Sequence, residues 1–398
     1  MTQPLIDSVA LLGALEESGS RVVIVSTGGG SQAIPHLLST PGASGVVLEC
    51  LVPYAREAVD RLLGGPQESY CSSRTARRLA VMAWQRACGL GTPPATAIGA
   101  AVTASLRSRT PKRGPHRIVA AVHGLGGTSV ATLVLRKEAR SRADEEMVAA
   151  ALLLERLAAT PCGRLRPPPS TRMQLFEDEH IEIECCEPPP AWRELLVGTL
   201  TAVHATRDPS RPRPASPTPP ADTPPTAGML VFPGSFDPLH EGHLRMATVA
   251  QEIAERPLDF ELSVTNVDKP SLDYLEMQSR AAQFAGRSLW FTRAATFVEK
   301  LDVFPQGTFV MGADTYARLA DAKYYGGSAE AADRAVQRIA TQASGLIVFG
   351  RERNGEFEDA AQLDVPPALR AVTYFVSQRE FRMDISSTAL RRHRDSTA

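Results

Sequence analysis

The sequence predicts two α/β domains, and its length, its alternation of strands and helices, and a proline-rich interruption support this. At 398 residues the chain is long enough for two or three domains, each with its own core. Short β-branched runs alternate with helical patterns in both halves, which is typical of strands and helices packed in layers. Between Pro209 and Pro225, eight prolines leave almost nothing apolar to bury, which predicts a polyproline II spacer. We therefore expect domains at 1–205 and 228–398, joined by a linker at 206–227.

In the first half, strands are expected where β-branched and small apolar residues run together, and helices where apolar residues recur every three or four positions. Met147, Ala150 and Leu154 show this helical spacing. We expect strands at 21–26, 95–105, 116–124 and 180–186, and helices at 31–40 and 137–159.

The second half alternates strands and helices more regularly, which predicts a Rossmann-like parallel sheet. A strand at 229–232 leads through a turn into a helix that begins near His243. Further strands are expected at 261–267, 307–313, 345–350 and 371–377, with helical stretches between them.

The composition is that of an ordinary globular protein that works in water. With 43 basic and 44 acidic side chains the formal net charge is -1, so the chain lacks the positive field that holds a nucleic acid. The first residues show no basic segment followed by an apolar one, and no apolar run approaches the roughly 20 residues that span a bilayer. The sequence therefore predicts a cytoplasmic protein with no nucleic-acid partner and no membrane partner.

The strongest chemical signal follows the first strand of the second half, where the sequence continues as GSFDPLHEGH. Gly234 permits a tight turn at the carboxyl end of this strand, which is where ligands bind in open α/β sheets. His240 and His243 lie in the first turn of the next helix, so both imidazoles can face the same spot as its free N–H groups. This arrangement predicts a phosphate site. The alternative is a helix cap or a structural metal site completed by Asp237 and Glu241, a spacing that matches no common zinc pattern.

A second cluster of hydroxyl groups and a cation lies near the C-terminus. Ser386, Ser387 and Thr388 precede a predicted helix and can supply N-cap oxygens and phosphate donors. Arg391 lies one helical turn further and can reach the same anion. The alternative is a plain helix cap with a solvated arginine.

Four more charged residues are candidates for substrate contacts. Asp314 and Arg351 each follow a predicted strand, although Asp314 could equally cap the next helix. Lys269 and Arg280 are candidate cations on the acceptor side, where the alternative is ordinary surface charge.

On these motifs, residues 228–398 resemble the HxGH nucleotidylyltransferase superfamily, whose second signature, ISSTxxR, matches Ile385 to Arg391. The Asp314 and Arg351 positions are similar to those of the nicotinate and nicotinamide mononucleotide adenylyltransferases. Tyr274 and Trp290 are candidates for the aromatic contacts of that family to its acceptor. The resemblance implies that His240, His243 and Arg391 are catalytic, that Gly234, Ser235, Phe236, Arg351, Ser386, Ser387 and Thr388 bind ATP, and that Asp314, Lys269 and Arg280 bind the acceptor.

The implied reaction transfers AMP from ATP to nicotinamide or nicotinate mononucleotide and releases pyrophosphate, with Mg²⁺ bridging the polyphosphate. The acceptor phosphate is already ionised near pH 7, so catalysis depends on positioning and on charge stabilisation. Two alternatives stay open. One is a related transferase that uses CTP or a phosphopantetheine-type acceptor. The other is a nucleotide-binding regulator without turnover.

The first half resembles the C-terminal domain of the CinA family, the nicotinamide-nucleotide amidases. The matching motifs are TGG at 27–29, TPGAS at 40–44, YAREAVDRLLG at 54–64 and AVT at 101–103. The resemblance implies an α/β domain that handles pyridine nucleotides.

The amidase chemistry is missing from these motifs. Val25 stands where the family has its nucleophilic serine, and Val59 stands where it has a lysine. Valine can neither attack an amide nor accept a proton, and Ser26 lies one position away without that lysine. The family's glycine-rich loop is replaced by Ala104 to Arg107. We therefore expect an inactive domain kept for folding, ligand sensing or formation of a homo-oligomer.

Overall fold

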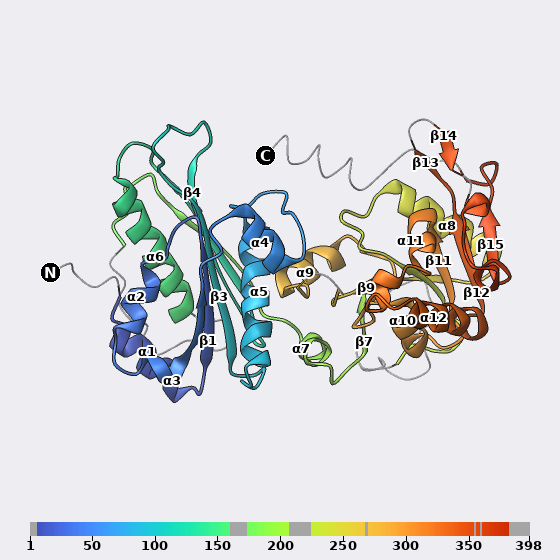
Figure 1. Ribbon diagram of the computed structural model, residues 1–398, viewed down its shortest axis with the longest axis horizontal. Coiled ribbons are helices and arrows are strands. Elements are labelled where there is room, and N and C mark those ends of the chain that lie inside the picture. The colour runs from blue at the N-terminus through green and yellow to red at the C-terminus, as the bar shows by residue number, and fades with distance from the viewer. Residues whose placement is uncertain are drawn as a thin grey trace. The chain divides into compact units, whose positions relative to one another are not determined.

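The computed structural model describes residues 6–159, 173–206, 224–266, 270–353, 356–358 and 360–381 (Figure 1). The chain divides into two compact units. Unit 1 is Met1–Arg193 with Asp268–Met277, and unit 2 is Glu194–Val267 with Gln278–Ala398. Each unit has a sheet covered by helices, which confirms the predicted α/β class. Within the described ranges, no helix is long and apolar enough to span a bilayer.

Unit 1 is built on a six-stranded mixed sheet in the order β2-β1-β3-β4-β5-β6. β1 pairs in parallel with β2 and β3, whereas β3, β4, β5 and β6 pair in antiparallel fashion. The strands are β1 (Arg21–Thr27), β2 (Val47–Leu51), β3 (Ala97–Ser105), β4 (His116–Gly124), β5 (Gly127–Leu135) and β6 (Ile181–Cys186). Of these strands, β2 and β5 were not predicted from the sequence.

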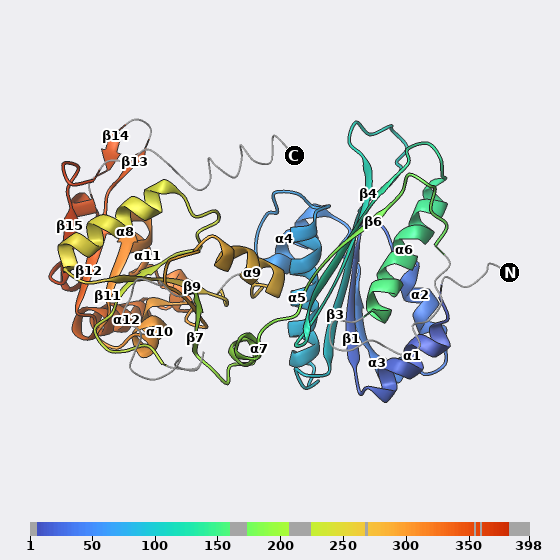
Figure 2. The same ribbon diagram turned by 180° about the vertical axis from the view of Figure 1, so that it is seen from behind.

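Helices cover both faces of this sheet (Figures 1 and 2). One face carries α1 (Ser8–Glu17), α2 (Ala33–Leu38), α3 (Ala43–Val46) and α6 (Arg142–Ala158), and the other carries α4 (Arg56–Leu63) and α5 (Ser73–Gly89). The expected helix at 137–159 begins at Arg142, because Ser141 and Asp144 form a capping box there. Its buried apolar residues join those of β1, β3, β4 and β5 in one core.

Unit 1 also includes a short segment from the second half of the sequence, residues 270–277. Asp273 accepts hydrogen bonds of 2.5 and 2.6 Å from Arg77 on α5. The Tyr274 backbone N–H donates to Thr128 Oγ1 at 3.1 Å, and its ring lies 5.3 Å from that of His123. Tyr274 is 0 % exposed, so its prediction as an acceptor contact is wrong.

Unit 2 is built on a seven-stranded sheet in the order β15-β12-β11-β8-β9-β10-β7. All its pairings are parallel except that of β7 with β10. The strands are β7 (Ala202–Thr206), β8 (Leu230–Pro233), β9 (Leu258–Ser263), β10 (Leu289–Thr292), β11 (Thr308–Gly312), β12 (Gly345–Phe349) and β15 (Thr373–Val376), and a separate hairpin joins β13 (Arg351–Arg353) to β14 (Glu356–Glu358).

The helical elements alternate with these strands. They are α7 (Pro190–Val197), α8 (Glu241–Ala254), α9 (Tyr274–Ala282), α10 (Phe297–Val303), α11 (Ala313–Arg318), η1 (Ala322–Tyr325), α12 (Ala329–Gln342), η2 (Ala360–Gln362) and α13 (Pro367–Arg370). Trp290 on β10 is 6 % exposed and packs against the rings of His204 and Phe304, so it is a core residue and not an acceptor contact.

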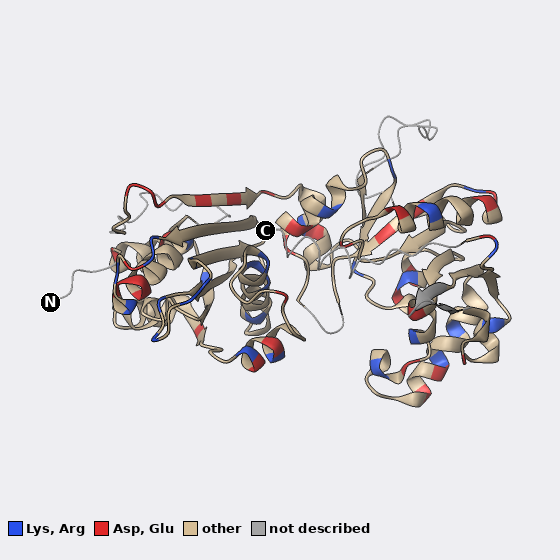
Figure 3. Cartoon of the chain, turned by 90° about the horizontal axis from the view of Figure 1, so that it is seen from above, with Lys and Arg blue, Asp and Glu red and all other residues tan. Residues whose placement is uncertain are grey.

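The unit boundaries differ from the domain ends expected from the sequence. Residues 194–206 were assigned to the first domain, yet β7 completes the sheet of unit 2 by pairing with β10. Residues 207–223 lie outside the described residues, so the polyproline conformation of the linker stays a prediction. Basic and acidic residues are interspersed along the ribbon of each unit, in keeping with the balanced charge (Figure 3).

Candidate functional site

The strand β8 lies where the order of the unit 2 sheet reverses. The chain passes from β8 through α8 to the neighbouring β9, and β11 later pairs with the other side of β8. The carboxyl end of such a strand opens into a crevice between connections that run in opposite directions. The GSFDPLHEGH loop therefore begins at the point of the sheet best suited to bind a ligand.

The turn after β8 depends on Gly234 and Phe236. The Gly234 N–H donates to the Glu261 carbonyl at 2.9 Å, and a Cβ on Gly234 would lie 2.7 Å from the Phe236 ring. Phe236 has a φ of 45°, a left-handed conformation that is strained for an aromatic residue. Its ring is 1 % exposed and packs against Phe260 and Phe284. Because this ring is buried, Phe236 has only its backbone to offer a nucleotide.

Two side chains near the end of α9 hold the same loop. Arg280 donates to the Ser235 carbonyl at 3.0 Å and lies 2.7 Å from the Asp237 carboxylate. Gln283 accepts a hydrogen bond of 2.7 Å from the Leu239 N–H. Arg280, which was predicted to bind the acceptor, is thus 5 % exposed and engaged with the loop. Its observed contacts make it a positioning residue.

The two histidines are brought together at the start of α8. His240 is the N-cap residue, and its backbone N–H donates to His243 Nδ1 at 3.3 Å. The rings stack with their centroids 3.7 Å apart and their planes 22° apart. The predicted convergence of the two imidazoles on the helix N-terminus is therefore present in the structure.

Burial keeps both imidazoles neutral near pH 7. It lowers the pKa of His240, and burial together with the nearby His240 lowers the pKa of His243 to about 3. Because Nδ1 of His243 accepts a hydrogen bond, the proton of its neutral ring lies on Nε2. His243 can thus offer an anion a neutral N–H donor at the positive end of the helix dipole.

Asp314 follows the strand next to β8. β11 pairs with β8 and ends at Gly312, which is the N-cap residue of α11. Asp314 is an exposed residue in the first turn of this helix, so it is not the cap. It follows the carboxyl end of its strand, as the GSFDPLHEGH loop does.

The residues that follow β10 and β11 enclose a cavity of about 160 Å³. Tyr325 is held by a hydrogen bond of 2.9 Å from its hydroxyl to the Leu319 carbonyl. The Arg318 side chain makes no hydrogen bond or ion pair with the residues described in the structure. No sequence pattern predicted this cavity, although the adjacent tyrosines Tyr324 and Tyr325, just after a strand and a helix, were a visible signal. The lining includes Thr296, Phe297, Arg318, Leu319, Tyr324 and Tyr325.

Six predicted site residues cannot be placed relative to the histidines. Lys269, Ser386, Ser387, Thr388 and Arg391 lie outside the described residues, and Arg351 is described by its backbone in β13. The convergence of Arg391 with the two imidazoles on one triphosphate, the contacts of the other ATP-site residues and the acceptor contact of Lys269 stay predictions.

Known proteins were found that are similar to the C-terminal part of the chain in sequence and to its N-terminal part in structure. Residues 231–393 match the model of the cytidylyltransferase-like family, which confirms the resemblance to nucleotidyltransferases. No curated protein sequence matches the chain. The C-terminal domain is thus cytidylyltransferase-like.

Solved structures of the CinA superfamily match the N-terminal part. A protein from Escherichia coli is 18% identical, with a TM-score of 0.32, over 37% of this chain and 84% of its own. The competence/damage inducible protein CihA from Agrobacterium tumefaciens is 21% identical, with a TM-score of 0.33, over 38% of this chain and 92% of its own. A competence or damage-inducible protein from Enterobacter asburiae is 20% identical, with a TM-score of 0.33, over 38% of this chain and 94% of its own.

Proposed function

We propose that the C-terminal domain transfers AMP from ATP to nicotinamide or nicotinate mononucleotide and releases pyrophosphate. The observation that carries the proposal is the pair of stacked imidazoles of His240 and His243 at the start of α8. They lie just beyond the carboxyl end of β8, the strand at which the sheet order reverses.

In the proposed reaction, a phosphate oxygen of the mononucleotide attacks the α-phosphorus of ATP. A new P–O bond forms and the bond between the α- and β-phosphates breaks, so that pyrophosphate leaves with the electron pair. The attacking phosphate is ionised near pH 7, so no side chain is needed as a base. The neutral His243 ring and the first N–H groups of α8 donate to phosphate oxygens, which stabilises charge as it moves to the leaving group.

The aromatic cavity supports the choice of acceptor. Its volume of about 160 Å³ fits one ring-sized group rather than a whole nucleotide. Phe297, Tyr324 and Tyr325 contribute aromatic surface, which attracts a cationic ring such as the pyridinium of these mononucleotides. Arg318, whose guanidinium is not paired with any described residue, adds a cation for a phosphate or carboxylate group.

Mg²⁺ enters the proposal as part of the Mg–ATP substrate. It prefers oxygen ligands and keeps several waters, so the phosphates and water would supply most of its coordination. We further propose that Ser386, Ser387, Thr388 and Arg391 contact the triphosphate, as the ISSTxxR signature implies.

A second candidate is transfer of CMP from CTP. The description of the matching family as cytidylyltransferase-like favours this donor. Two further alternatives are a phosphopantetheine-type acceptor and nucleotide binding without turnover. The test with different substrates distinguishes them from transfer to a pyridine mononucleotide.

The test is pyrophosphate release by the full chain, supplied in turn with ATP or CTP and with each mononucleotide. We expect release with ATP and a pyridine mononucleotide. His243→Ala should lower kcat on the order of 10² to 10³, the loss typical of one preorganised donor. The exposed His180→Ala is the matched control and should keep full activity. Release with CTP but not ATP would favour the second candidate, and full activity of His243→Ala would contradict the site.

A further inference from the structure

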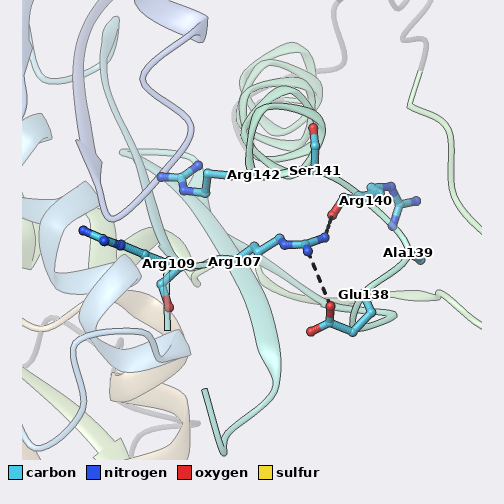
Figure 4. Close-up of a pocket in the computed structure, with 8 residues that line it drawn as sticks. Arg107, Arg109, Glu138, Ala139, Arg140, Ser141 and Arg142 are labelled. Carbon is cyan, nitrogen blue, oxygen red and sulfur yellow. Dashed lines mark hydrogen bonds and ion pairs between the residues drawn. The ribbon is translucent and has the colours of Figure 1, made fainter. Parts of the chain in front are cut away.

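A cavity of about 540 Å³ lies in unit 1, between the loop after β3 and the loop before α6 (Figure 4). Four arginines line it, Arg107, Arg109, Arg140 and Arg142, together with the carboxylate of Glu138. This volume is in the range of pockets that hold small molecules. The residues that the proposed transferase uses all lie elsewhere in the chain.

Arg140 and Arg142 are fixed in place by carboxylates that do not line the cavity. Arg140 donates to both oxygens of Glu179, at 2.5 and 2.6 Å, and the two side chains are 9% and 1% exposed. Arg142 lies 2.9 Å from Glu146 and donates to the Gly28 carbonyl at 3.2 Å. Arg140 is therefore buried and paired, whereas Arg142 is paired with the mostly buried Glu146 although its own side chain is 39% exposed.

Arg107 and Arg109 are compensated far less. The Arg107 backbone N–H donates to the buried Glu145 at 2.6 Å, which fixes the loop. Its guanidinium donates to the Arg140 carbonyl at 2.8 Å and lies 3.5 Å from Glu138 (Figure 4). The Arg107 and Glu138 side chains are 41% and 69% exposed, so this ion pair is weak. Arg109 is exposed and makes no hydrogen bond or ion pair with any described residue.

We propose that this cavity binds a phosphate-bearing small molecule, with Arg107 and Arg109 as the groups that hold its phosphate. A guanidinium presents paired N–H donors that match the oxygens of a phosphate, and the anion would replace Glu138 beside Arg107. The N-terminus of α6 is not part of the proposed phosphate site, because Ser141 and Asp144 already cap it.

The proposed site binds without turnover. Arg142, which lines the site, donates to the Gly28 carbonyl. Arg107, which also lines it, belongs to the segment that replaces the glycine-rich loop of the resembled amidases. Val25 and Val59, which stand at the amidase positions, supply neither a nucleophile nor a base. The proposal does not depend on the adenylyltransferase activity of the other unit.

The test is calorimetric titration of the full chain with inorganic phosphate, pyrophosphate and ADP as separate probes. The Arg107→Gln/Arg109→Gln variant removes two cavity charges, and Arg21→Gln/Arg113→Gln removes two exposed charges outside the cavity. We expect at least one probe to bind the native chain. The cavity variant should bind that probe at least about tenfold more weakly, and the control variant should bind it within about twofold of the native affinity. Comparison of the three probes shows whether the cavity binds a free phosphate or pyrophosphate ion or the phosphates of a nucleotide.

The same titration is repeated in the His243→Ala background, so that binding to unit 2 is recognised separately. Binding that persists there and is lost with Arg107 and Arg109 supports the proposal, even if no adenylyl transfer is ever detected. If the double variant does not fold, Arg109→Gln, which removes an exposed and unbonded side chain, replaces it. Absence of binding by all three probes, or equal weakening in the cavity and control variants, would overturn the proposal.

Discussion

Two histidines in this protein, His123 and His243, are neutral near pH 7 because they are buried. Burial lowers the pKa of His123 to about 4, and burial and the neighbouring His240 lower that of His243 to about 3. His123 is 0 % exposed, packs against the rings of Trp84 and Tyr274, and shares a hydrogen bond of 2.8 Å with Thr128. Both side chains would take up a proton readily in the unfolded chain, where a histidine titrates near pH 6.5.

The folded protein should therefore lose stability as the pH falls from about 6.5 towards 4. The folded-state pKa values are lowered, so the unfolded state binds more protons in this range and gains stability from them. Each such histidine contributes about 1.4 kcal/mol per pH unit to the slope of the free energy of unfolding against pH. Urea unfolding at a series of pH values measures this slope.

His123→Phe, which keeps an aromatic ring in the same packing, should reduce the slope. The exposed His180→Phe is the control and should leave it unchanged. Equal slopes for the native protein and His123→Phe would contradict a neutral buried His123.

At the scale of elements, the loop between β8 and α8 is held by α9. Arg280 contacts the Ser235 carbonyl and the Asp237 carboxylate, and Gln283 contacts the Leu239 N–H. These bonds fix the backbone that leads into the two histidines. We expect a residue placed in this way to affect the proposed reaction through the loop and not by contact with the acceptor.

Arg280→Ala should accordingly lower kcat about tenfold or more and leave the KM for the mononucleotide nearly unchanged. The substitution leaves the half-buried Asp237 without its cation and frees the loop to move. Steady-state kinetics of the full chain separates the two constants, with the exposed Arg287→Ala as the control. A raised KM at constant kcat would restore the acceptor-binding role predicted from the sequence.

At the scale of the whole molecule, each unit takes in residues that the sequence pattern places in the other domain. β7 joins the unit 2 sheet, and residues 270–277 pack within unit 1. In unit 1 the Asp273 carboxylate is bound by Arg77, which lies 196 positions away in the sequence, and both side chains are buried. The homo-oligomer expected through the N-terminal domain stays a prediction.

Arg77→Ala should destabilise unit 1 by about 3–5 kcal/mol, because it leaves the buried Asp273 carboxylate without the cation that compensates its charge. Arg86→Ala is the matched control on the same helix. It removes a more exposed pair with Glu49 and should cost less than about 1 kcal/mol. Denaturant unfolding followed by circular dichroism measures both, and equal effects would contradict the distinction between the two ion pairs.

The sequence by itself determined the local features of this protein. The α/β class, the strand and turn before His240, and the start of α8 depend on residues only a few positions apart, so the pattern predicted them. The strand expected at 261–267 is instead Leu258–Ser263, an error of a few residues in a correctly expected element.

The tertiary structure decided whatever depends on residues far apart in the chain. It placed β7 in the second sheet, buried Tyr274 and Trp290, and turned Arg280 towards the loop. It also assembled the cavity beside Tyr324 and Tyr325. Sequence periodicity shows that a face is apolar or that a charge is available. Which partner covers that face or binds that charge depends on strand order and packing, which bring together groups that no local pattern relates.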